Sequence, residues 1–174
     1  RIESYILHHN PDVIIAIGGG SSIDSVKAAN ALATLGAAVT PEIDHYFGVS
    51  VVSADLEKTG LKLRPVIAVE TSASSGAHLT KYANITDPVV GQKKLIVDNA
   101  IVPPVSVFDY ATTVSMPLSV TIDGALDAIA HTFEVFCGAK GETYELAKDI
   151  TATAIELVAT YAQVLVKDPK NIEA

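Results

Sequence analysis

Asp127 and His131 stand four residues apart in the apolar segment ALDAIAHTFEVF, residues 125–136. On a helix this spacing puts both side chains on one face, with Cβ atoms about 5–6 Å apart. A carboxylate and an imidazole together suit a divalent metal such as zinc or Fe(II). The pattern therefore predicts Asp127 and His131 as two metal ligands. The alternative is an ordinary Asp–His pair that faces solvent.

A glycine-rich turn follows the first apolar run of the chain. Residues 12–17 read DVIIAI, and glycines 18–20 and Ser21 lead from them into a helical pattern. Backbone N–H groups can approach a pyrophosphate at such a turn, because glycine has no Cβ and a helix N-terminus carries partial positive charge. We predict phosphate contacts from Gly19, Gly20 and Ser21, with Ser21 also capping the helix. The turn matches neither G-x-G-x-x-G nor Walker A, so a plain strand-to-helix turn is the alternative.

A second loop of small residues, TSASSG at 71–76, follows the apolar run PVIAVE at 65–70. The carboxyl ends of parallel strands meet at one edge of a sheet, and two such loops form the crevice in which α/β sheets bind nucleotides. We predict that three hydroxyls of this loop contact a cofactor's ribose and phosphates, those of Thr71, Ser72 and Ser75. His78 could face the same crevice. A solvated linker is the alternative for the loop.

The elements that must position these residues fall into two parts. Up to residue 110, apolar β-branched runs alternate with helical patterns, which is typical of βαβ units and a parallel sheet. Residues 37–64 read as a long loop with a short helical turn, and two long helical patterns follow at 118–136 and 143–166. We predict an α/β fold: a Rossmann-like parallel-sheet nucleotide domain over 1–110, then the start of an all-helical metal-binding domain over 111–174.

Composition restricts the partners and the compartment. The chain is 49% hydrophobic and 18% charged, which favours a packed core over disorder. Its formal net charge is -8 and its basic residues do not cluster, which disfavours nucleic acid and anionic membranes. The single cysteine, Cys137, allows no internal disulfide. We expect a cytoplasmic protein with a small-molecule substrate, no nucleic-acid or membrane partner, and self-association into a homo-oligomer.

Four segments together resemble the iron-containing alcohol dehydrogenases, and they occur in that family's order. GGGSSIDSVKAAN resembles the GGGSxxDxAK nucleotide loop, with Asp24 and Lys27 in register. VETSASSGAHLT resembles the P-T-T-A-G-T-G-S-E-V-T loop. GQKKLIVDNAIVPPVSVFDYATTVSMP is similar to the family's segment of lysine, strand, proline and aspartate. DGALDAIAHTFE resembles the G-x-D-A-x-x-H-x-x-E helix.

The resemblance implies a dehydroquinate synthase-like fold with two bound groups. The first domain would bind NAD or NADP, with Asp24 and Lys94 among its contacts. The second would bind a divalent metal, iron before zinc, through Asp127, His131 and two further histidines beyond Ala174. The first part of the nucleotide domain is expected to precede Arg1.

The implied activity is that of a metal-dependent, NAD(P)-linked alcohol dehydrogenase, with reversible hydride transfer between a small alcohol and an aldehyde or ketone. The alternatives are a glycerol dehydrogenase-like or dehydroquinate synthase-like enzyme of the same fold, or a non-catalytic nucleotide-binding fragment. Ser74 stands where the family has glycine, Ala77 where it has serine and His78 where it has glutamate. Serine takes positive φ less freely than glycine, so the geometry and cofactor contacts of this loop could differ.

Overall fold

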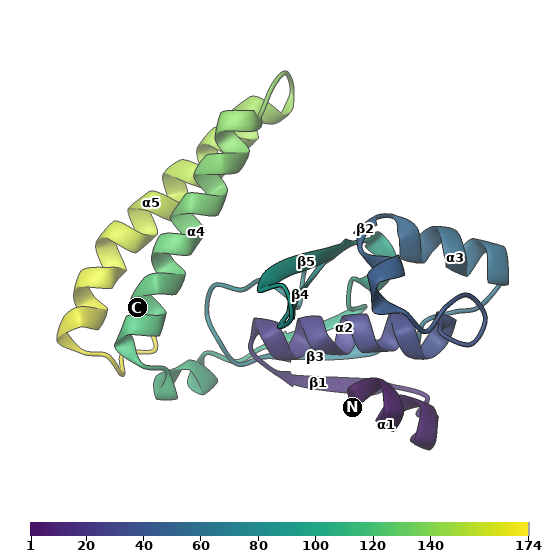
Figure 1. The fold of residues 1–174 in the computed structure, drawn as a ribbon. Coiled ribbons are helices and arrows are strands. Elements are labelled where there is room, and N and C mark those ends of the chain that lie inside the picture. The colour runs from purple at the N-terminus through teal and green to yellow at the C-terminus, as the bar shows by residue number, and fades with distance from the viewer. Residues whose placement is uncertain (174) are drawn as a thin grey trace. The chain divides into compact units, whose positions relative to one another are not determined.

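Three apolar strands form a parallel sheet in the first half of the chain. The structure, a computed structural model, describes residues 1–173. The strand order is β1-β3-β6 and both pairings are parallel; the strands are β1 (Ile14–Gly18), β3 (Val66–Glu70) and β6 (Val105–Phe108) (Figure 1). Gly18 lies opposite Glu70 and Glu70 opposite Phe108. The three carboxyl ends therefore share one edge, and the predicted α/β class is confirmed.

Helix α2 (Gly20–Leu35) covers one face of this sheet, and α1 (Ile2–His9) packs against α2. Ala16 of β1 and Ala68 of β3 are buried together with Ile23 of α2. Neighbouring side chains of a strand point to opposite faces, and on the other face Ile15 and Ile17 are 61% and 67% exposed. The uninterrupted apolar run predicts a strand buried on both faces. This is wrong for residues 1–173, because helices cover one face only.

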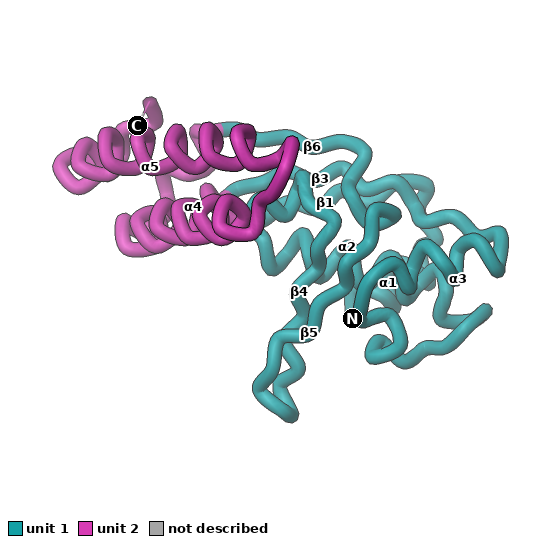
Figure 2. Tube along the Cα trace, turned by 90° about the horizontal axis from the view of Figure 1, so that it is seen from above, with its two compact units in different colours: residues 1–71, 76–109 teal, residues 72–75, 110–174 magenta. Residues whose placement is uncertain are grey.

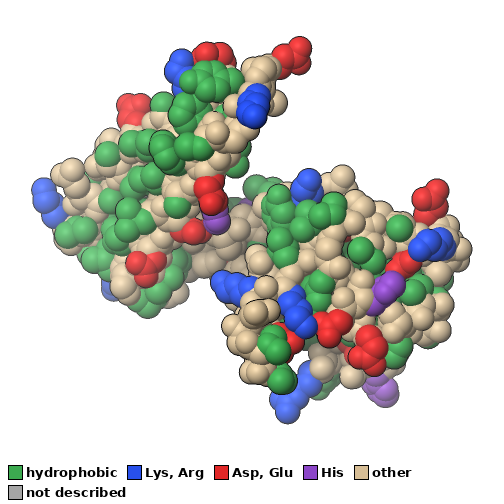
Figure 3. All heavy atoms as spheres, turned by 45° about the horizontal axis from the view of Figure 1, so that its top comes forward, with side chains coloured by type: hydrophobic (Ala, Val, Ile, Leu, Met, Phe, Trp, Pro, Cys, Tyr) green, Lys and Arg blue, Asp and Glu red, His purple; other side chains and the backbone are tan. Residues whose placement is uncertain are grey.

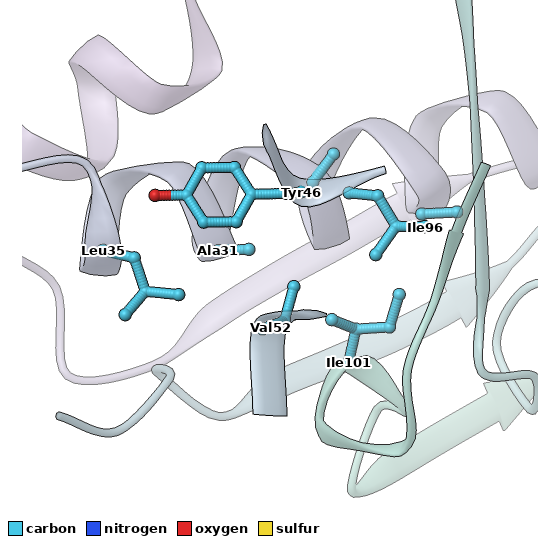
Figure 4. Packing of buried hydrophobic residues seen from close by; sticks show 8 residues of the cluster. Ala31, Leu35, Tyr46, Val52, Ile96 and Ile101 are labelled. Atoms are coloured by element: carbon cyan, nitrogen blue, oxygen red, sulfur yellow. The ribbon is translucent and has the colours of Figure 1, made fainter. Parts of the chain in front are cut away.

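A smaller sheet contributes to a second core cluster, which also includes Ala28, Ala31 and Leu35 of α2. It has the order β2-β5-β4, with β4 antiparallel to β5; its strands are β2 (Gly48–Val49), β4 (Tyr82–Asp87) and β5 (Gln92–Val97). Short 3-10 helices η1 (Ile43–Tyr46) and η2 (Asn99–Ile101) flank it. Figure 4 shows Tyr46 and Ile96 packed near Ala31 and Leu35 of α2, and all four side chains are fully buried.

Helix α3 (Val51–Thr59) occupies part of the region that the sequence predicts as a long loop. Val52 is fully buried in the core shown in Figure 4. At the helix N-terminus, the amide of Ser53 donates to Oδ2 of Asp98 at 2.8 Å, and the Ser53 hydroxyl also donates to Asp98. The prediction of a loop is wrong here, because the helix is stabilised by a carboxylate far along the chain.

Two long helices follow η3 (Tyr110–Ser115): α4 (Leu118–Gly138) and α5 (Thr143–Lys167), both as predicted. They pack along each other, and the hydroxyl of Thr151 in α5 donates to the carbonyl of Thr132 in α4 at 2.8 Å. Hydrophobic side chains gather on the surface of this helical pair (Figure 3), among them Leu126 and Phe133. By length and composition alone α5 could cross a membrane. A core helix of a soluble protein has the same properties, so this assigns no membrane.

The chain packs as two compact units, drawn in two colours in Figure 2. The α/β unit comprises residues 1–71 and 76–109, and the helical unit comprises 72–75 and 110–174. The short segment 72–75 therefore belongs to the helical unit, although it follows strand β3 in the sequence. That one unit binds a nucleotide and the other a metal stays a prediction.

Candidate functional site

The glycine-rich turn joins the carboxyl end of β1 to the N-terminus of α2. Gly18 has a φ of +152°, and a Cβ added there would lie 2.7 Å from both Cβ and Oγ of Ser22. Only glycine fits this approach. Gly19 is the N-cap of α2, and its carbonyl accepts from the amide of Ser22 at 3.0 Å. The helix thus begins two residues earlier than expected, and the prediction of Ser21 as the cap is wrong.

The N-terminus of α2 has the properties of an anion site. The first N–H groups of a helix have no partner within the helix, and here no side chain caps them. The first turn also holds no acidic residue, so no carboxylate competes for the partial positive charge. Gly19, Gly20 and Ser21 stand at this end, and their backbone could hold a phosphate. Their role as phosphate ligands stays a prediction.

Further along α2, two charged side chains tie the helix to β4. Oδ2 of Asp24 accepts from the amide of Asn84 at 3.0 Å. The ammonium of Lys27 donates to the carbonyls of Thr80 and Tyr82 at 2.7 and 2.9 Å. Burial raises the pKa of Asp24 and lowers the pKa of Lys27 to about 8. The contacts of Asp24 are thus with a strand, whereas the sequence predicts a cofactor contact for it.

A fully buried carboxylate lies at the carboxyl edge of the parallel sheet, beside the glycine-rich turn. Glu70 ends β3 opposite Gly18, and the amide of Thr71 donates to the Gly18 carbonyl at 3.2 Å. Oε2 of Glu70 lies 3.3 Å from Nδ1 of His78. Sequence reasoning singled out His78 and missed Glu70. The sequence signal for Glu70 is its place at the end of the apolar run PVIAVE. A carboxylate there is expected to be buried and therefore to have partners.

The predicted cofactor loop divides between the two units: Thr71 belongs to the α/β unit, and Ser72 and Ser75 to the helical unit. Ser74 has a φ of +99°. A positive φ of this kind favours glycine, and Ser74 adopts it although it has a Cβ. Its hydroxyl donates to Oδ2 of Asp127 at 3.4 Å. This is the contact that joins the loop to the candidate metal ligands.

Asp127 and His131 lie on one face of α4, with Oδ2 and Nδ1 3.6 Å apart. Their side chains are 51% and 69% exposed, so further ligands have access to both. Within residues 1–173, no three His, Cys, Asp or Glu side chains gather closely enough to hold a metal ion. A catalytic metal site needs about three protein ligands. The pair fits two places of such a set, and its metal role stays a prediction.

Lys94 lies in β5 of the smaller sheet, not at the carboxyl edge of the parallel sheet. Its ammonium lies 2.6 Å from Oδ1 of Asp44 and 2.9 Å from Oδ2 of Asp87. The hydrogen bonds to these two carboxylates raise the pKa of Lys94. The cofactor contact predicted for Lys94 would compete with both acids.

Known proteins resemble this chain over nearly its whole length. It is 33% identical over 165 residues to the NAD-dependent methanol dehydrogenase of Bacillus methanolicus, covering 95% of this chain and 40% of that protein. The NADH-dependent butanol dehydrogenase A of Thermotoga maritima has a similar structure, with a TM-score of 0.78, 26% identity and coverage of 99% and 40%. Sulfoacetaldehyde reductase from Bifidobacterium kashiwanohense, solved with NAD+, has a TM-score of 0.75 and 26% identity. The match covers 98% of this chain and 42% of that one.

The chain spans about 40% of the length of these proteins. A model of one family, described as iron-containing alcohol dehydrogenase, matches residues 1–110. This segment includes the glycine-rich turn, Glu70 and His78, and it makes up more than half of the chain. The chain therefore belongs to the iron-containing alcohol dehydrogenase family.

Proposed function

We propose that this chain serves a metal-dependent, NAD(P)-linked alcohol dehydrogenase that interconverts a small alcohol and an aldehyde or ketone. The observation that carries the proposal is the Asp127–His131 pair, with 3.6 Å between carboxylate and imidazole on one face of α4. As an exposed pair four residues apart the two groups stabilise the helix by only about 0.2–0.5 kcal/mol, whereas a shared cation would use both of them. Family membership supplies the reaction class.

The nucleotide would lie at the carboxyl edge of the parallel sheet. Gly19, Gly20 and Ser21 would hold its pyrophosphate through the uncapped N-terminus of α2. The hydroxyls of the following loop would serve its ribose and nicotinamide side, and these are Thr71, Ser72 and Ser75. NAD is proposed before NADP, because the methanol dehydrogenase is named NAD-dependent and the sulfoacetaldehyde reductase was solved with NAD+.

Asp127 and His131 would hold the metal. The family description favours iron, whereas a carboxylate and an imidazole by themselves suit zinc equally well. When bound, the metal would supply Lewis-acid polarisation of a substrate oxygen, and the nicotinamide would supply a hydride acceptor. The Ser74 hydroxyl donates to Oδ2 of Asp127. A hydrogen bond of this kind orients a ligating carboxylate, so Ser74 would fix the direction in which Asp127 presents its oxygens.

The remaining partners follow from composition and surface. A net charge of -8 makes nucleic acid and anionic membranes poor partners, and we propose a cytoplasmic protein with small-molecule substrates. The apolar side chains exposed on the helical unit would be covered in a homo-oligomer or by further parts of the same protein.

The test is to change each candidate ligand in the full-length protein, as Asp127→Ala and His131→Ala. Both variants should lose bound metal by elemental analysis and lose alcohol-dependent formation of NADH, while thermal unfolding of the metal-free proteins changes little. Asp149→Ala is the matched control, since this exposed acid lies on the neighbouring helix α5. Metal content equal to that of the wild type in both variants would refute the assignment.

A further inference from the structure

The buried pair of Glu70 and His78 lies beside the turn that would hold the cofactor's phosphates. Glu70 is opposite Gly18 in the sheet, and neighbouring strands lie about 4.8 Å apart. Residues 66, 68 and 70 share the face that α2 covers, where Ala77 is buried with Ile23. The negative charge of Glu70 reaches this helix, because it acts on the carboxyl of Asp24 and the ammonium of Lys27.

A buried carboxylate at this place opposes the binding of an anion. Like charges repel more strongly in a protein interior than in water, and the pyrophosphate of a dinucleotide carries two negative charges. The α2 N-terminus has no acidic residue in its first turn. Two acids stand at this edge of the sheet: Glu70, which is fully buried and opposite Gly18, and the exposed Asp109 after β6. The buried ammonium of Lys27 offsets part of the Glu70 charge, and a phosphate site here would gain from a second group in contact with Glu70.

His78 is placed to be that group. Its Nδ1 lies 3.3 Å from Oε2 of Glu70, and only 12% of its side chain is exposed. A carboxylate oxygen accepts, so the contact is a hydrogen bond from His78 when the ring carries its proton on Nδ1. The ring stacks on Phe108 with 5.9 Å between centroids and 14° between planes, and the backbone carbonyl of His78 accepts from the Ser106 hydroxyl. Residue 78 is thus held in place by ring stacking and by a hydrogen bond to its backbone carbonyl.

We propose that His78 is a positioning residue for the cofactor, which shields the phosphate site from the buried Glu70 carboxylate. This inference rests on the proposed nucleotide binding, and it makes His78 and Glu70 a coupled pair. The pair would change affinity for charged nucleotides and would leave the metal ligands untouched.

The test uses the full-length protein with NADH, ADP and adenosine as ligands. His78→Phe keeps the stacking on Phe108 and removes the N–H donor. We expect it to weaken NADH and ADP about tenfold and to change adenosine less than about twofold, because adenosine has no phosphate. Adding Glu70→Gln to this variant should bring NADH affinity back to within about threefold of the wild type. An equal loss for adenosine, no loss for any ligand, or no recovery in the double variant would each overturn the proposal.

His45→Phe is the matched control. His45 Nε2 lies 2.7 Å from Oδ2 of the buried Asp55, so it forms the same kind of pair, but with α3 and far from the glycine-rich turn. It should lower the unfolding midpoint without changing nucleotide affinity. If His78→Phe does not fold, Glu70→Gln alone decides: it should bind NADH at least as tightly as the wild type, and weaker binding contradicts the shielding. A wild-type protein that binds neither NADH nor ADP would instead overturn the proposed function, and this inference with it.

Discussion

Gly124 of α4 lies directly against Ser74, so closely that a Cβ added to Gly124 would be 2.7 Å from the Ser74 Cβ and 3.2 Å from the carbonyl of Ala73. The hydroxyl of the same Ser74 reaches Asp127, one helical turn away from Gly124, at 3.4 Å. The absence of a side chain at position 124 thus sets how closely the loop 72–75 approaches the candidate metal ligands.

Gly124→Ala should therefore displace the loop and weaken the metal site. Alanine favours a helix over glycine by about 1 kcal/mol, but the contact with Ser74 forces the loop outward. We expect the full-length variant to bind metal about tenfold more weakly, measured by titration with a chelator. Gly138→Ala is the control, because a Cβ there meets nothing within 4 Å. Equal metal affinity in Gly124→Ala and wild type would show that the loop does not position Asp127.

Ser74 has two separable effects, one of its backbone and one of its hydroxyl. Its φ of +99° is unfavourable for a residue with a Cβ, at a cost on the order of 1–3 kcal/mol. Ser74→Gly should thus raise the unfolding free energy by about 1 kcal/mol in urea titrations, whereas Ser74→Ala keeps the strain. Both remove the hydroxyl, so both should orient Asp127 less well and lower metal retention to a similar extent. A glycine variant no more stable than the alanine variant would rule out strain at this position.

The elements that could be predicted from sequence are those whose pattern is local. Helices α4 and α5 follow from their long helical patterns, and Asp127 and His131 share a face because helical geometry alone requires it. Helix α3 could not be predicted in this way, since its N-terminal amide at Ser53 bonds Asp98, 45 residues away. Glu70 was missed because its partner His78 is brought to it by the loop after β3, which contains no helix or strand and so has no periodic pattern to read.

Asp55 offers a test of acid stability in the α/β unit. The hydrogen bond from His45 lowers the pKa of this buried carboxyl, and Lys58 adds to the effect. A carboxyl whose pKa is lowered in the folded state stabilises the protein fully at pH values above its unfolded pKa of 3.8. This stabilisation is lost as the pH falls through the folded pKa.

Asp55→Asn should accordingly lower the unfolding free energy at neutral pH by about 1–3 kcal/mol. The difference from the wild type should shrink as the pH is lowered below 3.8, the unfolded value. Denaturant titrations at a series of pH values measure it, with Asp12→Asn as an exposed control. A difference that stays constant down to the acid limit would mean that the carboxylate charge does not act here.

For Lys27 we predict a pH dependence of stability in the alkaline range. Burial lowers its pKa to about 8, from 10.5 in a model compound, so the folded protein releases this proton before the unfolded chain does. Between about pH 8 and 10.5 the unfolded state binds more protons, and the contribution of Lys27 to the unfolding free energy must rise with pH.

Lys27→Met removes this contribution together with the hydrogen bonds to the carbonyls of Thr80 and Tyr82. At neutral pH the variant should be less stable by about 1–3 kcal/mol, since two part-buried carbonyls lose a charged donor. Its deficit relative to the wild type should then widen from about pH 8 to 10.5. Lys62→Met, at an exposed position, controls for the loss of a positive charge. If the unfolding free energies of Lys27→Met and wild type differ by a constant amount over this range, Lys27 keeps its proton in the folded protein. Its hydrogen bonds to the carbonyls of Thr80 and Tyr82 then persist at high pH.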